Sequence, residues 1–141
     1  MIGIEERSDK YLDPKVRKRW LLCKAEFLRR FPNLPQPFLT STYRDEARQN
    51  FYYQNGKSQV RGGYSLHQYG FAFDIAFRDN PKSRKAIFEI FLYQKFAGIA
   101  KYYELEWGGD WKWFLDYGHF QAPITIENAR AGKQPMWYKL I

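Results

Sequence analysis

The chain has 141 residues, and its 23 lysines and arginines outnumber its 15 aspartates and glutamates by enough to give a net charge of +8. This length suits one domain with a real core, and an aromatic content of 20% excludes a disordered chain. A single cysteine, Cys23, excludes an internal disulfide. We expect one domain over residues 1–141, because neither a linker nor a repeat interrupts it. The charge favours an anionic partner: nucleic acid, lipid or cell-wall polymer.

Targeting signals are not evident in the sequence. Residues 1–15 contain no apolar segment of signal-peptide length, and no stretch approaches the roughly 18 apolar residues of a membrane span. We therefore expect cytoplasmic synthesis without a signal peptide, and no membrane span. No recognised nucleic-acid-binding motif accompanies the basic charge, so nucleic acid is not the expected partner.

The secondary-structure signals run as follows along the chain. Asp13 and Pro14 predict the start of a helix that Pro32 ends. Residues 38–44 predict a strand, and residues 45–56 a short helix that ends at Asn55-Gly56. Residues 69–77 predict a strand, residues 80–103 the longest helix, and residues 105–107 and 118–122 two short strands. This order predicts an α+β fold, a small antiparallel sheet flanked by helices.

The strand over residues 69–77 alternates strictly. The large residues Phe71, Phe73, Ile75 and Phe77 share one face, and Asp74 lies between alanines on the other. Small neighbours give the aspartate room to reach a ligand.

Only two histidines occur in the chain, His67 and His119. Together with Asp74 they supply two imidazoles and a carboxylate, a donor set that suits catalytic zinc and leaves a position for water. Other divalent ions can occupy such a site. Taken singly, each residue also has a plain structural interpretation, as a hydrogen-bonded histidine or a turn cap.

Asp116 stands three residues before His119, across a Tyr-Gly turn. A carboxylate there can take a proton from an activated water and return it to a leaving amine. The alternative is a turn aspartate that caps backbone amides. Asp110 could orient a ligand imidazole, and Trp107, Trp111 and Trp113 are interpreted as core and pocket wall, one of which could line a cleft.

Three blocks of the sequence, in this order, carry a family resemblance. "TSTYRDEARQNFYYQNG" has an arginine after a strand and then a glutamine-rich helix, "SLHQYGFAFD" fits the pattern S-x-H-x-x-G-x-A-x-D, and "WGGDWKWFLDYGHFQ" leads into an acid-x-x-H-F pattern. Over residues 38–122 the chain resembles the M15 zinc metallopeptidases, in particular the L-alanyl-D-glutamate endopeptidase branch that includes phage endolysins. The resemblance implies the D,D-peptidase/hedgehog-like zinc peptidase fold.

The resemblance also assigns roles to residues. It implies that His67, Asp74 and His119 bind one zinc ion and that Asp116 is the general base. It implies that Arg44 binds substrate or steadies the developing oxyanion. Ser65, the serine of the pattern, would line the substrate site. The dipeptidase branch has glutamate where this chain has Asp116, which makes a D-Ala-D-Ala dipeptidase less favoured.

The implied function is zinc-dependent hydrolysis of the peptidoglycan stem peptide, with the L-Ala–D-Glu bond favoured. Two alternatives remain: a D,D-carboxypeptidase of the same family, and a non-catalytic zinc-binding module that interacts with the cell wall. By analogy we expect a monomeric endolysin that reaches the wall after release, with a holin as possible partner.

Overall fold

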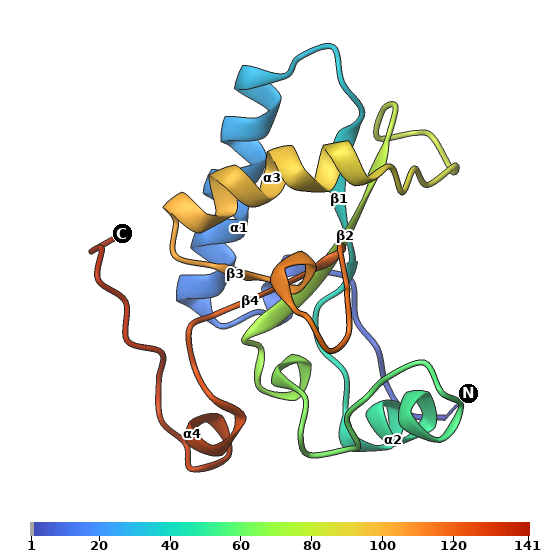
Figure 1. Ribbon diagram of the computed structural model, residues 1–141, viewed down its shortest axis with the longest axis vertical. Helices are drawn as coiled ribbons and strands as arrows, with labels where there is room; N and C mark the ends of the chain where they lie inside the picture. The colour runs from blue at the N-terminus through green and yellow to red at the C-terminus, as the bar shows by residue number, and fades with distance from the viewer. Residues whose placement is uncertain (1) are drawn as a thin grey trace.

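A small antiparallel sheet forms the centre of the computed structural model, which describes residues 2–141 (Figure 1). Its strands lie in the order β1-β2-β4-β3, and every neighbouring pair is antiparallel. Their bounds are β1 (Gln36–Ser41), β2 (Ala72–Arg78), β3 (Glu106–Trp107) and β4 (His119–Gln121). The structure confirms the α+β class with a small antiparallel sheet.

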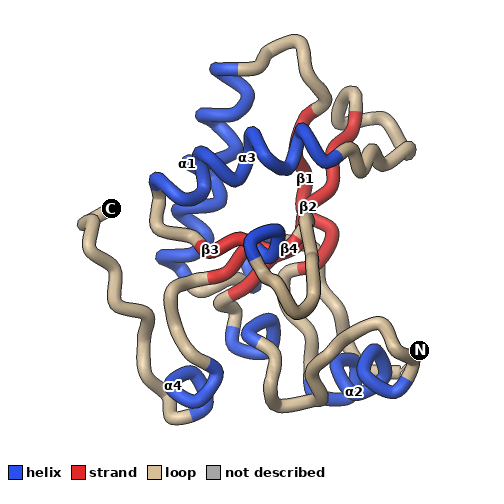
Figure 2. The backbone as a smooth tube through the Cα atoms, viewed as in Figure 1, coloured by secondary structure: helices blue, strands red, loops and turns tan. Residues whose placement is uncertain are grey.

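Two long helices, α1 (Pro14–Arg30) and α3 (Ile90–Tyr102), pack against each other and cover one side of the sheet (Figure 2). The shorter helices α2 (Glu46–Gln54) and α4 (Ile126–Arg130) lie at the opposite end of the molecule. Three 3-10 turns complete the elements: η1 (Asp9–Tyr11), η2 (Leu66–Tyr69) and η3 (Gly108–Asp110).

The first helix begins where the sequence predicts. The side chain of Asp13 accepts hydrogen bonds from the backbone N–H groups of Lys15 and Val16, at 3.0 and 3.3 Å. Pro14 occupies the first helical position, where its missing N–H costs nothing. Cap and proline together fix the start of a helix whose apolar side faces the core.

Aromatic rings fill the space between the sheet and the two long helices. Phe73 of β2 lies 5.5 Å from Trp20 of α1 and 5.8 Å from Phe120 of β4, between ring centroids. Phe96 of α3 meets Phe120 at 5.0 Å. These rings are buried, so the large residues of β2 face the helices as predicted, and Asp74 faces the opposite side.

Three predicted elements had clearly wrong bounds. The strand predicted over residues 69–77 spans Ala72–Arg78, because Tyr69 belongs to η2 and Gly70 ends that turn. The predicted helix over residues 80–103 begins only at Ile90, because Ile87 is extended and exchanges two backbone hydrogen bonds with Phe77, at 2.7 and 3.1 Å. The strand predicted over residues 38–44 spans Gln36–Ser41, because the chain then leaves the sheet and Arg44 pairs with Glu5 near the N-terminus. Among residues 2–141, no helix is both long and apolar enough to cross a membrane.

Candidate active site

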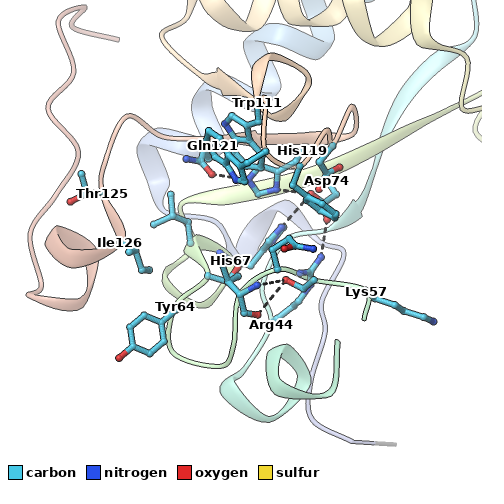
Figure 3. A pocket seen from close by; sticks show the side chains of 18 of the residues that line it. Arg44, Lys57, Tyr64, His67, Asp74, Trp111, His119, Gln121, Thr125 and Ile126 are labelled. Carbon is cyan, nitrogen blue, oxygen red and sulfur yellow. Dashed lines mark hydrogen bonds and ion pairs between the residues drawn. The ribbon is translucent and has the colours of Figure 1, made fainter. Parts of the chain in front are cut away.

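Strand pairing brings two distant residues together on the sheet face away from the long helices. In the register of β2 and β4, Asp74 lies directly opposite His119. His67 comes from η2, the turn just before β2. One ligand atom from each of the three side chains lies within 4.8 Å of the other two (Figure 3). The structure thus brings together the three residues that the sequence proposes as metal ligands.

The short segment before β2 is built to hold His67 in place. Ser65 and Gln68 form a capping box around η2, in which the Ser65 hydroxyl accepts a hydrogen bond from the His67 backbone N–H at 3.3 Å. Gly70 ends the turn with φ of 75°, and a Cβ there would lie 2.9 Å from the Asp13 backbone nitrogen. Ser65 and Gly70 of the sequence pattern therefore have structural roles here, and Ser65 also lines the pocket.

Each imidazole is oriented by an oxygen acceptor on its outer side. His67 Nδ1 lies 3.0 Å from the Thr42 carbonyl oxygen, and His119 Nε2 lies 2.8 Å from Gln121 Oε1. Gln121 is itself oriented, because its amide nitrogen donates to Glu106 at 3.2 Å. These oxygens can only accept, so the outer nitrogens carry the protons. The inner nitrogens then present lone pairs to the centre of the site.

Both inner nitrogens converge on one carboxylate oxygen. Asp74 Oδ1 lies 3.2 Å from His67 Nε2 and 3.0 Å from His119 Nδ1. Two lone pairs and a carboxylate oxygen at this separation repel one another unless a cation lies among them. The donor set therefore fits a divalent metal ion, for which imidazole nitrogen and carboxylate oxygen are ordinary ligands.

The shifts in pKa of Asp74 and the two histidines also indicate a site that favours a bound cation. Burial acts to raise the pKa of Asp74, but the adjacent imidazoles hold it well below its usual range. Burial lowers the pKa of His67. Burial also acts to lower the pKa of His119, but its interaction with the Asp74 carboxylate and the negative charge of Asp116 outweigh burial, and the net shift is upward. The buried carboxylate thus stays ionised and attracts a cation to its imidazole side.

Arg44 holds the other oxygen of Asp74. Its Nη2 donates to Asp74 Oδ2 at 2.8 Å, its Nε to Glu5 Oε2 at 2.7 Å and its Nη1 to Gln49 Oε1 at 3.1 Å. A guanidinium has five N–H donors, so two remain without a partner among residues 2–141. Arg44 lines the pocket, and its geometry adds a second role to the substrate role that the resemblance implies: it positions Asp74.

Asp116 lies in the turn that delivers His119. Its carbonyl oxygen accepts from the His119 N–H at 3.2 Å, and its own N–H donates to the Gly108 carbonyl at 3.1 Å. A Cβ on Gly108 would lie only 2.3 Å from the Asp116 carbonyl oxygen, so only glycine permits this approach. Burial, and then the charge of Asp74, raises the pKa of the Asp116 carboxyl. A carboxylate with a raised pKa is a stronger base, which suits general acid and base work.

One cavity of about 360 Å³ joins these groups. His67, Asp74, His119, Asp116 and Arg44 all line it. In Figure 3, Trp111 lies beside His119 on one side of the cluster, and Arg44 and Lys57 lie on the other. The remaining labelled wall consists of Tyr64, Gln121, Thr125 and Ile126.

One candidate residue lies elsewhere. Asp110 is exposed and pairs with Lys101 at 2.8 Å, so it orients neither imidazole, and the prediction of that role is wrong. The orienting groups are the Thr42 carbonyl and Gln121. Gln121 could have been found by its spacing, since a residue two positions after His119 on a strand shares its face. The sequence gives no comparable signal that Glu5 pairs with Arg44.

Comparisons with known proteins agree with this geometry. An M15 peptidase model, described as D-alanyl-D-alanine carboxypeptidase, matches residues 58–122, which span η2, β2, β3 and β4. Over this segment, which is just under half of its length, the chain is similar to the M15 peptidases. It is also similar to the "Peptidoglycan L-alanyl-D-glutamate endopeptidase CwlK" of Bacillus subtilis (strain 168), to which it is 31% identical over 59% of this chain and 58% of that protein. The chain thus spans less than two thirds of that curated relative.

A solved M15 structure is also similar in fold. The "L-Ala D-Glu endopeptidase ChiX" of Serratia marcescens matches with a TM-score of 0.63 and 27% sequence identity. The match covers 80% of this chain and 81% of that one.

Proposed function

We propose that this chain is an M15 peptidase, a zinc-dependent peptidoglycan hydrolase that cuts the L-Ala–D-Glu bond of the stem peptide. The observation that carries the proposal is the meeting of two oriented imidazole lone pairs with Asp74 Oδ1 inside a pocket that Asp116 also lines. The names of CwlK and ChiX, both L-alanyl-D-glutamate endopeptidases, support the choice of bond.

His67, Asp74 and His119 are the proposed ligands of one ion. When bound there, a divalent ion supplies Lewis-acid polarisation of the scissile carbonyl and lowers the pKa of a water molecule. Zinc is the proposed ion because two imidazoles and one carboxylate form a common catalytic zinc set.

Asp116 is the proposed general base and acid. Its carboxylate takes a proton from the attacking water and passes it to the departing amine. Its raised pKa makes its carboxylate a stronger base than that of an ordinary aspartate. The turn from Asp116 to His119 fixes the distance between the base and the ligand cluster.

Arg44 is proposed to act in two ways. Through its bond to Oδ2 it keeps Oδ1 of Asp74 turned toward the imidazoles. Its remaining N–H groups are proposed to interact with the oxyanion that develops on the attacked carbonyl, or with a substrate carboxylate. Ser65 lines the same pocket and is proposed to contact the substrate there.

The direct test is mass spectrometry of purified peptidoglycan after digestion by the zinc-loaded protein. The expected products are a free D-Glu amine on the peptide and L-Ala left on the sugar. Asp116→Asn should abolish both while metal binding persists. Failure of the zinc-loaded wild type to cut any of several wall types would overturn the proposal and leave a non-catalytic wall-binding module.

The same digest tests a second candidate, the D,D-carboxypeptidase. The description of the matching family model favours this activity. Its product would be single D-Ala residues, with the L-Ala–D-Glu bond intact. We further propose an endolysin role, in which the protein acts on the wall after release from the cytoplasm. A fall in turbidity of cells exposed to the purified protein supports that role, and no fall counts against it.

A further inference from the structure

An exposed aromatic surface adjoins the proposed metal centre. The indoles of Trp111 and Trp113 stack with centroids 5.5 Å apart and planes 17° apart. Trp111 in turn lies 5.0 Å from the ring of His119. Trp113 is 75% exposed, although both tryptophans line the cavity. One face of the Trp113 indole is therefore covered by Trp111, and the residue offers the rest of its large apolar surface to whatever enters the pocket.

The segment that carries this surface is fixed at its base. The Gly108 carbonyl oxygen accepts hydrogen bonds from both the Trp111 N–H, at 3.2 Å, and the Asp116 N–H, at 3.1 Å. Residues 111–116 therefore form a loop whose two ends are hydrogen-bonded to the same carbonyl oxygen. The stacked indoles thus have a defined position relative to Asp116 and the metal ligands.

The cavity has two chemically different ends. Trp111 lies beside His119 at the aromatic end, and Arg44 and Lys57 lie beyond the ligand cluster at the cationic end (Figure 3). A substrate that spans the cluster therefore meets an apolar, planar surface on one side of the reacting bond. On the other side it meets positive charge.

The stem peptide, the substrate proposed above, also has two chemically different sides at its L-Ala–D-Glu bond, one uncharged and one negatively charged. On the amino side stand L-Ala and the uncharged N-acetylated muramyl sugar, and on the carboxyl side stand the carboxylates of D-Glu and the residues that follow. As an extension that rests on the proposed function, we propose that Trp113 is a sugar-binding platform for the muramyl ring, while Arg44 and Lys57 receive the carboxylate side.

Lengths agree with this placement. The His119 ring lies 5.0 Å from the Trp111 ring, and the Trp113 ring lies 5.5 Å from that of Trp111, between centroids. L-Ala and the lactyl ether, which join the scissile carbonyl to the sugar, each span roughly 3.5 Å when extended, or roughly 7 Å together. A sugar ring joined through these units therefore reaches the stacked indoles.

The chemistry of recognition is that of an amphipathic ring on an aromatic face. The C–H groups on one side of a pyranose carry partial positive charge, and the face of an indole is negative. Tryptophan also loses little side-chain freedom when it binds, so an exposed indole makes an efficient contact. A neutral sugar needs no charged partner at this end of the pocket.

The test compares two soluble substrates that share one stem peptide, one carrying the disaccharide and one carrying an N-acetyl group in its place. We expect the zinc-loaded wild type to have a higher kcat/KM on the sugar-bearing substrate. We expect Trp113→Ala to reduce the ratio of the two values roughly threefold to tenfold, and Trp113→Tyr to retain most of it. Phe88→Ala is the matched control, because Phe88 is 68% exposed and does not line the cavity.

Equal ratios for the wild type and Trp113→Ala would overturn the platform. A parallel measurement separates this failure from failure of the proposed function. In it, muramyl-L-alanine, the sugar-side product, is titrated into the wild type and Trp113→Ala while protein NMR shifts are followed. Weaker binding by the variant supports the platform even if neither substrate is cut. Identical binding, or none, overturns it.

Discussion

Arg44 and Asp74 are joined by a hydrogen bond of 2.8 Å between Nη2 and Oδ2, on the opposite side of the carboxylate from the two imidazoles. The arginine therefore occupies the oxygen that the proposed metal does not need. Its outer partner is Glu5, so a series of charged groups connects the N-terminal segment to the proposed metal ligands.

The first prediction concerns Arg44. Arg44→Lys keeps the charge but loses the planar fork that bonds Asp74 and Glu5 together. We expect zinc affinity to fall about 10- to 100-fold, the usual cost of losing a group that orients a ligand, in a competition titration with a chromophoric chelator. Arg84→Lys, on the exposed loop before α3, should bind zinc like the wild type. Unchanged affinity in Arg44→Lys would show that Asp74 holds its orientation without the fork.

A second prediction concerns the outer side of His119. Gln121→Leu removes the oxygen that accepts from His119 Nε2 at 2.8 Å. Either ring nitrogen can then carry the proton, and the ring loses its fixed tautomer. We expect zinc affinity to fall about tenfold or more in the same titration. Gln134→Leu, an exposed position far along the chain, is the matched control. Equal affinities for the two variants would contradict the orienting role.

The third prediction is a pH dependence of stability. Burial acts to raise the pKa of Glu5, but hydrogen bonds from Tyr52, Arg44 and Ser41 outweigh it, so the pKa lies below its ordinary value of 4.5. A carboxyl whose pKa is lower in the folded state than in the unfolded state stabilises the protein at any pH above the unfolded pKa. That stabilisation is lost as the pH falls through the folded pKa.

Glu5→Gln should therefore be less stable than the wild type at pH 7, by about 1–3 kcal/mol for the charged hydrogen bonds lost. The difference should shrink below roughly pH 4.5, where Glu5 begins to gain a proton. Thermal unfolding from pH 7 to pH 3 measures both curves. Glu6→Gln is the neighbouring control. A difference that stays constant across this range would refute the assignment.

The fourth prediction concerns the single thiol. Cys23 is fully buried in α1, and burial raises its pKa to about 12, against a smaller opposing effect of Arg19. Because the thiolate is the reactive form, we expect no reaction with a thiol reagent at pH 8 in the folded protein and complete reaction in guanidinium chloride. A Ser83→Cys variant, on the loop after β2, should react at once when folded. Rapid labelling of the native Cys23 would mean that α1 opens readily.

Local signals predicted much of this structure. Asp13 and Pro14 mark the start of α1 because a cap and a proline act on adjacent residues. The alternation of β2 placed Asp74 on the open face for the same reason, since the period of a strand is a local property. The resemblance supplied what alternation cannot, namely that His67 and His119 meet Asp74.

Other features depend on contacts between segments far apart in the chain. The pairing of Glu5 with Arg44, and of Ile87 with Phe77, is decided by the folded context and overrides the local preference of each segment. The five-residue helix α4 is too short to leave a periodic pattern. Asp110 looked like an orienting acid in the sequence, but only the fold shows that its carboxylate faces Lys101.

The carbonyl oxygen of Gly108 accepts hydrogen bonds from the backbone N–H groups of both Trp111 and Asp116. The segment between these two residues is therefore a loop anchored at a single point. The four residues between them can change in number or type without moving the strand that bears His119, because the joint lies in the backbone and requires only that position 108 stay glycine. Under the proposed function, changes of wall preference at this joint, by evolution or by loop grafting, would leave the proposed metal ligands where they are.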